Sequence, residues 1–188
     1  MLINSPQKLF MIMLGCKPTG RATEQHDVFF GIGPNLKSLV PEIIASWPHA
    51  KDLHIDSWRE VTQVNGFTIS IIPRKKTSTH TFKLFFINLG GYKVNDLEEF
   101  HYKILSVAEN LSEALRETKQ CAFYLHTGFR GAESHVDDKY GIDVDDSYNV
   151  EDLLNSDTKK KFAIHVSHQL SGIEDQLHSG YLKLGKII

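Results

Sequence analysis

The sequence has few cysteines, no long apolar run and no excess of charge of either sign. Two cysteines among 188 residues, Cys16 and Cys121, cannot form a disulfide framework, and reduced thiols are typical of a cytosolic protein. No apolar run approaches the roughly 20 residues that a membrane-spanning helix needs. Lysine and arginine number 21 against 23 for aspartate and glutamate, a formal net charge of -2. We therefore expect a cytoplasmic protein that binds neither membranes nor nucleic acids.

Several motifs of nucleotide-binding and hydrolytic enzymes are also missing. The sequence contains no G-x-x-x-x-G-K-[ST], G-x-S-x-G or G-x-G-x-x-G element, which leaves P-loop, serine hydrolase and dinucleotide-binding activities without support. What the chain does have is the composition of a globular protein, with 41% hydrophobic and 10% aromatic residues. That content is sufficient for the cores of one or two compact domains.

A segment near the N-terminus recurs in the middle of the chain. Residues 8–15, KLFMIMLG, return as residues 83–90, KLFFINLG, at an offset of 75. Between residues 8–40 and 83–115, ten of 33 positions are identical, where about two would be expected from average composition. Such self-similarity indicates a tandem duplication. After an insertion, we match His54-Ile55-Asp56 with His135-Val136-Asp137, and residues 67–71 with residues 162–166.

Each copy has the pattern of two strands, a helix and two further strands. In the first copy, a short apolar run followed by a segment of alternating polarity predicts a hairpin. Asn35 is a typical helix N-cap, and the apolar residues after it recur at helical spacing up to Trp47. Asn65-Gly66 predicts a type I′ turn between the last two strands. The predicted elements of the first copy are strands at residues 9–14, 26–33, 53–61 and 67–72 and a helix at residues 36–47.

We therefore predict an α+β protein of two tandem ββαββ units. One helix in each unit favours a small sheet that wraps around it, as in the ubiquitin roll (β-grasp). A unit of this size buries little apolar surface alone, so we expect the two units to pack together as a pseudo-twofold internal dimer. The predicted domains are residues 1–75, a linker at 76–82, and residues 83–188 with an acidic insertion at 141–158 and a C-terminal tail.

The insertion in the second copy is rich in acidic residues, and we expect an exposed acidic loop there. Its Asp143-x-Asp145-Asp146 spacing resembles a calcium-binding loop only loosely. The central glycine and the distal glutamate that such a loop needs are missing.

Histidine and carboxylate pairs that occur in both copies are the candidate functional residues. Residues two apart on a strand point to the same face, so each pair presents two polar groups side by side. If adjacent strands bring the pairs together, each copy assembles two imidazoles and two carboxylates. That set suits a divalent metal ion such as zinc or a histidine–carboxylate acid–base pair. The candidate shared polar site comprises Glu24, His26, His54 and Asp56 in the first copy and Glu99, His101, His135 and Asp137 in the second.

The more economical interpretation of these residues is structural. His26 shares the strand parity of Val28, Phe30 and Ile32, the predicted core face. A buried histidine that is hydrogen-bonded to a carboxylate is an ordinary way to satisfy a polar group in a core. We therefore predict no cofactor. The alternative is a divalent metal ion, with His26, His54, His101 and His135 as its candidate ligands.

Four segments of the chain resemble a known family. The segments Lys8–Gly15, Glu24–Val28, Leu53–Trp58 and Lys83–Gly91 together resemble a bacterial family of domains of unknown function, number 1543. The resemblance covers the chain from about Lys8 to His168. It implies a bacterial cytosolic protein with a duplicated domain and no assigned activity, so no catalytic residues carry over from it. The segment Gly141–Thr158 and the tail past His168 depart from the usual pattern of the family.

The repeated pairs support two functional hypotheses. The leading one is a non-enzymatic binding or protein-interaction module, in which a sheet edge recruits a partner strand or the chain associates with itself. The alternative is a metal-dependent or histidine–carboxylate enzyme that acts on a small substrate. The first predicts histidines that are buried or hydrogen-bonded within each copy. The second predicts that Glu24, His26, His54 and Asp56 converge within metal-ligand distance. The sequence leaves open whether the protein is an enzyme.

Overall fold

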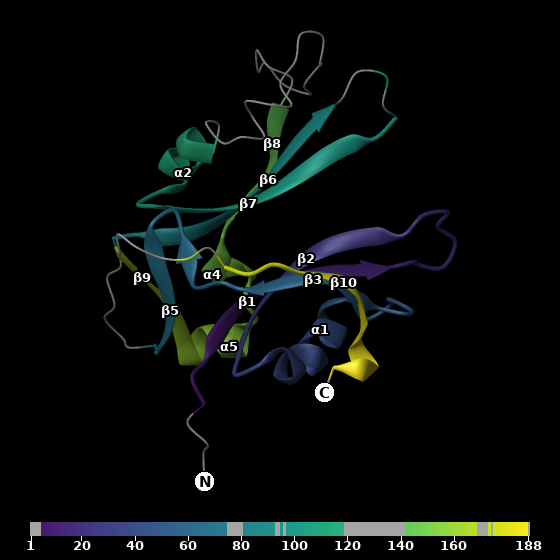
Figure 1. The fold of residues 1–188 in the computed structure, drawn as a ribbon, viewed down its shortest axis with the longest axis horizontal. Helices are drawn as coiled ribbons and strands as arrows, with labels where there is room; N and C mark the ends of the chain where they lie inside the picture. Colours follow the sequence, from purple (N-terminus) through teal and green to yellow (C-terminus); the bar gives the residue numbers. More distant parts are fainter. Residues whose placement is uncertain are drawn as a thin grey trace. The chain divides into compact units, whose positions relative to one another are not determined.

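A computed structural model describes residues 5–74, 81–92, 95, 97–118, 142–168, 173 and 175–187. Within these residues the chain is α+β, with mostly antiparallel sheets and short helices (Figure 1). It divides into two compact units: residues 1–78 together with 153–188 form the first, and residues 79–152 form the second. None of the helices in the described ranges is long and apolar enough to cross a membrane.

The main sheet of the first unit has the strand order β10-β3-β1-β2, and its pairings are antiparallel. One face packs against a 3₁₀ turn, η1, and the helix α1 that continues it, because alternating apolar residues of the strands meet apolar residues at helical spacing. The elements are β1 (Lys8–Cys16), β2 (Gln25–Gly33), η1 (Leu36–Leu39), α1 (Val40–Ser46), β3 (His54–Glu60), β10 (His178–Lys183) and η2 (Leu184–Lys186). The buried core consists of Phe10, Ile12, Leu14, Phe29, Leu36, Leu39, Ile43 and Ile55.

The predicted start of the helical segment in the first unit is confirmed. The side chain of Asn35 accepts a hydrogen bond from the Ser38 amide at 3.0 Å, as an N-cap does. The helix ends two residues before Pro48, which cannot continue it. In the second unit, the side chain of Asn110 accepts from the Glu113 amide at 3.0 Å in the same way.

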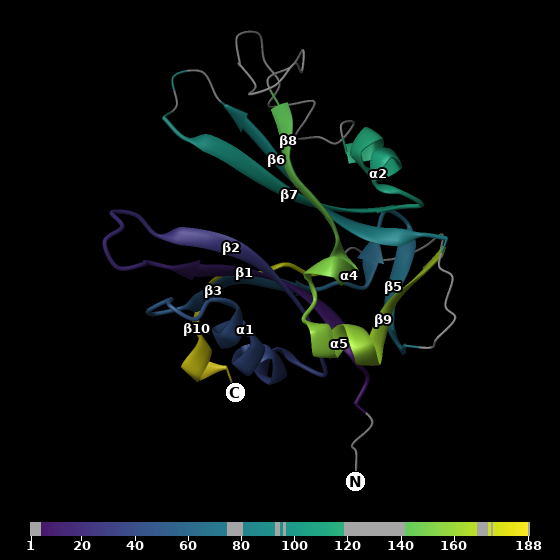
Figure 2. The same ribbon diagram turned by 180° about the vertical axis from the view of Figure 1, so that it is seen from behind.

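A second sheet in the first unit has the order β4-β5-β9. Asn65 and Gly66 join β4 to β5 with positive φ angles of 51° and 80°, as the predicted type I′ turn requires. The fourth strands of the two predicted units, β5 and β9, pair antiparallel with each other (Figure 2). The β-grasp prediction requires each of these strands to join the sheet formed by the earlier strands of its own unit. Instead, β5 and β9 lie in a separate sheet. The strands are β4 (Gln63–Val64), β5 (Phe67–Pro73) and β9 (Phe162–His168).

The second unit is built on an antiparallel sheet of order β7-β6-β8. The helix α2 packs on one face of this sheet through Ala114 and Leu115. The elements are β6 (Lys83–Tyr92), β7 (Glu99–Ala108), α2 (Leu111–Thr118), β8 (Ile142–Asn149) and α4 (Val150–Leu153), after which α5 (Ser156–Lys161) lies in the first unit. The buried core consists of Phe85, Ile87, Leu89, Ala108 and Ala114.

The C-terminal half differs from the prediction in two respects. The segment 141–158 was expected as an exposed acidic loop, but its described residues, 142–158, contain β8, the short helix α4 and the start of α5. A strand tolerates exposed acidic side chains when its backbone groups are paired, so composition did not reveal β8. Residues 153–188 belong to the first unit, because β9 pairs with β5 and β10 pairs with β3.

The first two strands of each unit pair in equivalent register. Gly15 opposes His26 in the first unit, and Gly90 opposes His101 in the second. Every pair of the β1–β2 ladder recurs in the β6–β7 ladder with both partners displaced by 75 residues. The repeated sequence is therefore accompanied by a repeated strand pairing.

The third strand of each unit, β3 or β8, contains a β-bulge where it pairs with the first strand. The bulge lies opposite Met13 and Leu14 of β1 and opposite Asn88 and Leu89 of β6, which are again 75 residues apart. Beyond the bulge, Gly15 opposes His54 in the first unit, whereas Gly90 opposes Asp143 in the second. The strand register thus aligns Asp143 with His54, whereas the sequence comparison had matched His54 with His135. The residues matched to this strand from the sequence, His135 and Asp137, lie outside the described residues.

Candidate metal centre

Polar side chains gather over Gly15 on the main sheet of the first unit. Gly15 opposes His26 on β2 and His54 on β3, so both histidines share its face of the sheet. Asp56 is the extra residue of the β-bulge in β3. This face is opposite to the one that packs on α1, since the neighbouring core residue Leu14 points the other way.

Two carboxylates each lie near both imidazoles. Glu24 directly precedes β2, and its Oε1 is 3.0 Å from Nε2 of His54, which is also 3.3 Å from Oδ1 of Asp56. Nε2 of His26 is 3.3 Å from Oδ2 of Asp56 and 3.9 Å from Oε2 of Glu24. Imidazole and carboxylate therefore alternate around a ring. We call these four residues, Glu24, His26, His54 and Asp56, the first cluster.

His54 is the buried histidine of the first cluster. It is 3% exposed, and its ring centroid lies 4.2 Å from that of Tyr181 on β10. Its Nδ1 is 2.8 Å from the backbone carbonyl of Asp52, a residue with an uncommon left-handed φ of 57°. A carbonyl only accepts, so Nδ1 donates a proton to it, and Nε2 is the ring nitrogen that faces the carboxylates.

Two polar atoms of the first cluster are buried without a hydrogen bond. Among the described residues, neither Nε2 of His54 nor Oδ2 of Asp56 has a hydrogen-bond partner. Most buried polar groups in proteins are hydrogen-bonded, and an unsatisfied one costs about 1–3 kcal/mol. A structural histidine–carboxylate pair would satisfy these atoms directly. A cation between them satisfies both as ligands.

Gly15 leaves the space that the first cluster occupies. A Cβ at position 15 would lie 2.6 Å from Oδ2 of Asp56 and 2.7 Å from Nε2 of His54. Neither separation is compatible with van der Waals radii, so any side chain at position 15 would displace the Asp56 carboxylate and the His54 ring. The glycine and the polar side chains above it form one arrangement.

A related cluster lies over Gly90 in the second unit. Nε2 of His101 is 3.1 Å from Oδ2 of Asp145 and 4.0 Å from Oε2 of Glu99. One ligand atom from each of the three residues lies within 4.8 Å of the other two. A Cβ at position 90 would lie 2.7 Å from Oε1 of Glu99 and would overlap Asp145. We call Glu99, His101 and Asp145 the second cluster.

Most of the predicted site residues are brought together within their units. The first cluster unites Glu24, His26, His54 and Asp56, and the second contains Glu99 and His101, whereas His135 and Asp137 lie outside the described residues.

The structure departs from the sequence interpretation at His26 and Asp145. The side chain of His26 is 49% exposed and lies on the face away from α1, so its interpretation as a core histidine was wrong. Asp145, expected in a loop, is the extra residue of the β-bulge in β8, as Asp56 is in β3. The repeated glycines at positions 15 and 90 were the signal that could have located the clusters, because each lies beneath one of them.

Cys16 is unsuited to act as a ligand or nucleophile in the first cluster. It is fully buried and by strand parity belongs to the face opposite Gly15. Burial and, to a smaller extent, the Glu24 carboxylate raise the pKa of the Cys16 thiol. The thiol therefore stays protonated near neutral pH, and the thiolate is the form that binds metals.

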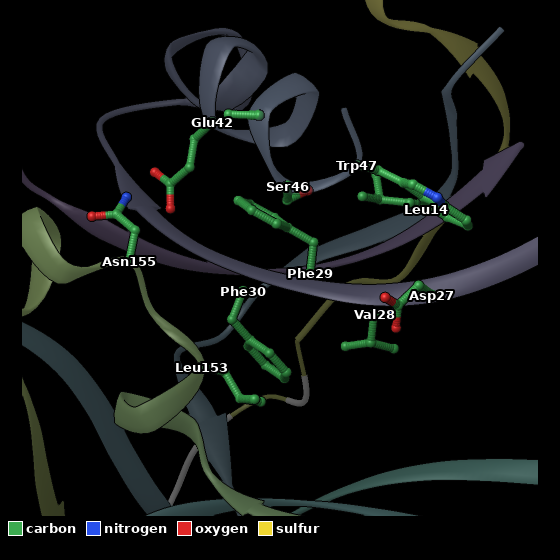
Figure 3. A pocket seen from close by; sticks show the side chains of 11 residues that line it. Leu14, Asp27, Val28, Phe29, Phe30, Glu42, Ser46, Trp47, Leu153 and Asn155 are labelled. Atoms are coloured by element: carbon green, nitrogen blue, oxygen red, sulfur yellow. The ribbon is translucent and has the colours of Figure 1, made fainter. Parts of the chain in front are cut away.

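A cavity of about 330 Å³ lies beside β2, an edge strand of the main sheet among the described strands (Figure 3). Its walls are mostly apolar and include Phe29, Phe30 and Leu153, while Glu42 and Asn155 contribute polar groups. Burial raises the pKa of the Glu42 carboxyl, and a hydrogen bond with the Asn155 side chain opposes that shift in part. The cavity therefore contains a carboxylate that is poorly solvated.

We expect Glu42→Gln to stabilise the protein at neutral pH. Because folding raises the pKa of Glu42, the folded state binds its proton more tightly than the unfolded state does. The protonated Glu42 therefore stabilises the folded state, fully at pH below the pKa of the unfolded state. This stabilisation is lost as pH rises through the pKa of the folded state. Urea unfolding should show the variant more stable than the wild type at pH 7, with the gain fading in acid. Glu117→Gln, at an exposed position of α2, is the control, and a gain independent of pH would contradict the assignment.

The family comparison points to a domain without an assigned function. Residues 21–71 match the model of DUF1543, Domain of Unknown Function. All four residues of the first cluster fall inside this match, which covers a minor part of the chain. No curated protein matches the sequence.

A solved structure supports the fold of the chain. The crystal structure of a protein designated Il1583 from Idiomarina loihiensis is similar, with a TM-score of 0.63 and 20% sequence identity. The similarity covers 95% of this chain and 98% of that one. At this level of identity the likeness shows the fold alone.

Proposed function

We propose that this protein binds a divalent transition-metal ion in the first cluster, with Zn²⁺ as the best fit. The observation that carries the proposal is the buried Nε2 of His54, which faces two carboxylates at 3.0 and 3.3 Å and has no hydrogen-bond partner in the described part of the chain. Neutral imidazole nitrogen and carboxylate oxygen are the ligands that Zn²⁺ takes in proteins. The proposal develops the metal alternative that the repeated polar pairs predicted.

The distances in the first cluster support a small ion. Zn²⁺ lies about 2.0–2.2 Å from such ligands, so neighbouring ligand atoms of a tetrahedral site are roughly 3.3–3.6 Å apart. The four nitrogen–oxygen distances run from 3.0 to 3.9 Å, and the two histidines face different oxygens of each carboxylate, so the side chains have to move closer together for one ion to contact all four residues. With an ion bound, the two imidazoles are neutral and the two carboxylates carry two negative charges. A divalent cation neutralises these charges and so offsets the repulsion between the carboxylates.

His54 is oriented as metal-binding histidines usually are. Its second ring nitrogen donates to the backbone carbonyl of Asp52, the outer contact that fixes the tautomer and the ring orientation of a ligand. This contact leaves Nε2 as the coordinating atom. The ligand is therefore held in place before an ion arrives.

Exposure on one side of the first cluster favours a reactive ion over a closed structural one. The side chains of His26 and Glu24 are 49% and 42% exposed, so this side of the site borders solvent, and water or a small ligand can bind the ion there as a fifth ligand or in place of one of these two exposed side chains. Structural zinc sites are closed, while catalytic sites keep an open position. The arrangement therefore supports metal-dependent chemistry on a small substrate.

The interaction module remains a second candidate function. The mostly apolar cavity beside the edge strand β2 favours it, because an extended partner segment adds to a sheet at such an edge. We also propose that the two units arose by duplication, which their equivalent strand registers support. A bacterial origin and a cytoplasmic location stay predictions from the family resemblance.

The experiment that tests the metal proposal compares zinc binding by the full chain and by His26→Ala. His26 is exposed, so we expect the variant to fold while its zinc affinity at the first cluster falls by about 100-fold or more, at the upper end of what loss of a supporting contact costs. The measurement is metal content by mass spectrometry after dialysis against a zinc buffer, with a titration of affinity. His49→Ala, an exposed histidine outside the cluster, is the control. Equal zinc content in all three proteins would refute the proposal.

A further inference from the structure

We infer that the second cluster is a separate cation site, with a weaker preference for Zn²⁺ over harder divalent ions than the first cluster has. The inference rests on the proposed function of the first cluster and extends it to the second unit. It starts from two shared features. Each cluster lies over a glycine whose Cβ would overlap the polar side chains, and each takes a carboxylate from a β-bulge at the equivalent point of the sheet.

The second cluster has the donor atoms for one ion. The ligand atoms of Glu99, His101 and Asp145 lie within 4.8 Å of one another. Nε2 of His101 is 3.1 Å from Oδ2 of Asp145, close to the spacing of neighbouring ligands around a small cation. Three protein ligands leave further positions for water, as Mn²⁺ and Mg²⁺ require for octahedral coordination.

The two clusters differ in the number of imidazoles. His54 opposes Gly15 in the first unit, and the position opposite Gly90 in the second unit is taken by Asp143. Among the residues that the structure describes, the first cluster therefore offers two imidazole nitrogens and the second cluster offers one, from His101. Imidazole suits zinc, while carboxylate and water suit magnesium, calcium and manganese. Fewer imidazoles reduce the advantage of Zn²⁺ over Mn²⁺.

Two single variants isolate the clusters in the full chain. His26→Ala weakens the first cluster and leaves the second, and His101→Ala does the reverse; both histidines are exposed. Each variant is titrated with Zn²⁺ alone and with Mn²⁺ alone, by calorimetry and by the spin resonance of free Mn²⁺. The double variant gives the background, and circular dichroism verifies folding.

The measured quantity is the dissociation constant of Mn²⁺ divided by that of Zn²⁺. We expect this ratio to be at least about tenfold smaller in His26→Ala, which reports the second cluster, than in His101→Ala, which reports the first. A change around a metal ligand alters affinity by about that much. Equal ratios, or no binding by His26→Ala above the double variant, would overturn the inference while leaving the first cluster intact. Zinc binding that persists in His26→Ala but is lost in His101→Ala would instead overturn the proposed function of the first cluster.

Discussion

Gly15→Ala should abolish metal binding by the first cluster. The new Cβ would lie 2.6 Å from Oδ2 of Asp56, 2.7 Å from Nε2 of His54 and 3.2 Å from Cε1 of the same ring. The ring cannot easily move away, because Nδ1 is bonded to the carbonyl of Asp52 and the ring packs against Tyr181. We expect zinc affinity to fall by about 100-fold or more, since the displaced groups are the ligands themselves.

The same substitution should also reduce stability. Forcing a methyl group into filled space costs about 1–3 kcal/mol, which urea unfolding of the ion-free protein measures. Gly185→Ala is the matched control, because a Cβ there meets no heavy atom of the described residues within 4 Å. A Gly15→Ala protein with wild-type zinc affinity would show that the cluster is not the binding site.

Zinc should raise the melting temperature of the wild-type protein substantially, and a chelator should reverse the rise. An ion that binds only the folded state at about 1,000 times its dissociation constant stabilises that state by roughly 4.1 kcal/mol. For a chain of 150–250 residues each kcal/mol corresponds to about 2–4 °C, so we expect a shift of roughly 8–16 °C in the transition of the first unit. Differential scanning calorimetry with and without zinc provides the measurement.

The control for this shift is His26→Ala, which keeps the fold but lacks an exposed ligand. Its melting temperature should respond to zinc far less than that of the wild type. The response should also weaken in acid, because protons compete with the ion for histidine and carboxylate ligands. An equal rise in the wild type and in His26→Ala would place the stabilising ion elsewhere.

Local patterns were sufficient to predict several parts of the fold. The apolar run of β1, the alternation of β2, the N-cap at Asn35 and the turn at Asn65-Gly66 all depend on residues close together in the chain, and the structure contains each of these elements. Glu24 and His26 were found for a related reason. Their repetition at an offset of 75 is visible without knowledge of the fold.

Long-range pairing was out of reach of such patterns. Nothing in β9 or β10 alone indicates that they pair with β5 and β3, because backbone hydrogen bonds between strands carry little record in the side chains. The β-bulge that makes Asp145 the counterpart of Asp56 was hidden for the same reason. Similarity to His54 pointed to His135, whereas the strand register selects Asp143.

The amino-acid order was enough to establish an α+β chain with a repeated core segment and to name the acids and histidines of the first cluster. Only the folded structure determines whether those side chains lie close together and whether their polar atoms have hydrogen-bond partners. The burial of His54, its tautomer and the close approach of both carboxylates arise from β1, β2 and β3 lying side by side over Gly15. Such proximity is a property of packing in three dimensions, because it is produced by residues that are up to about 40 positions apart in the chain.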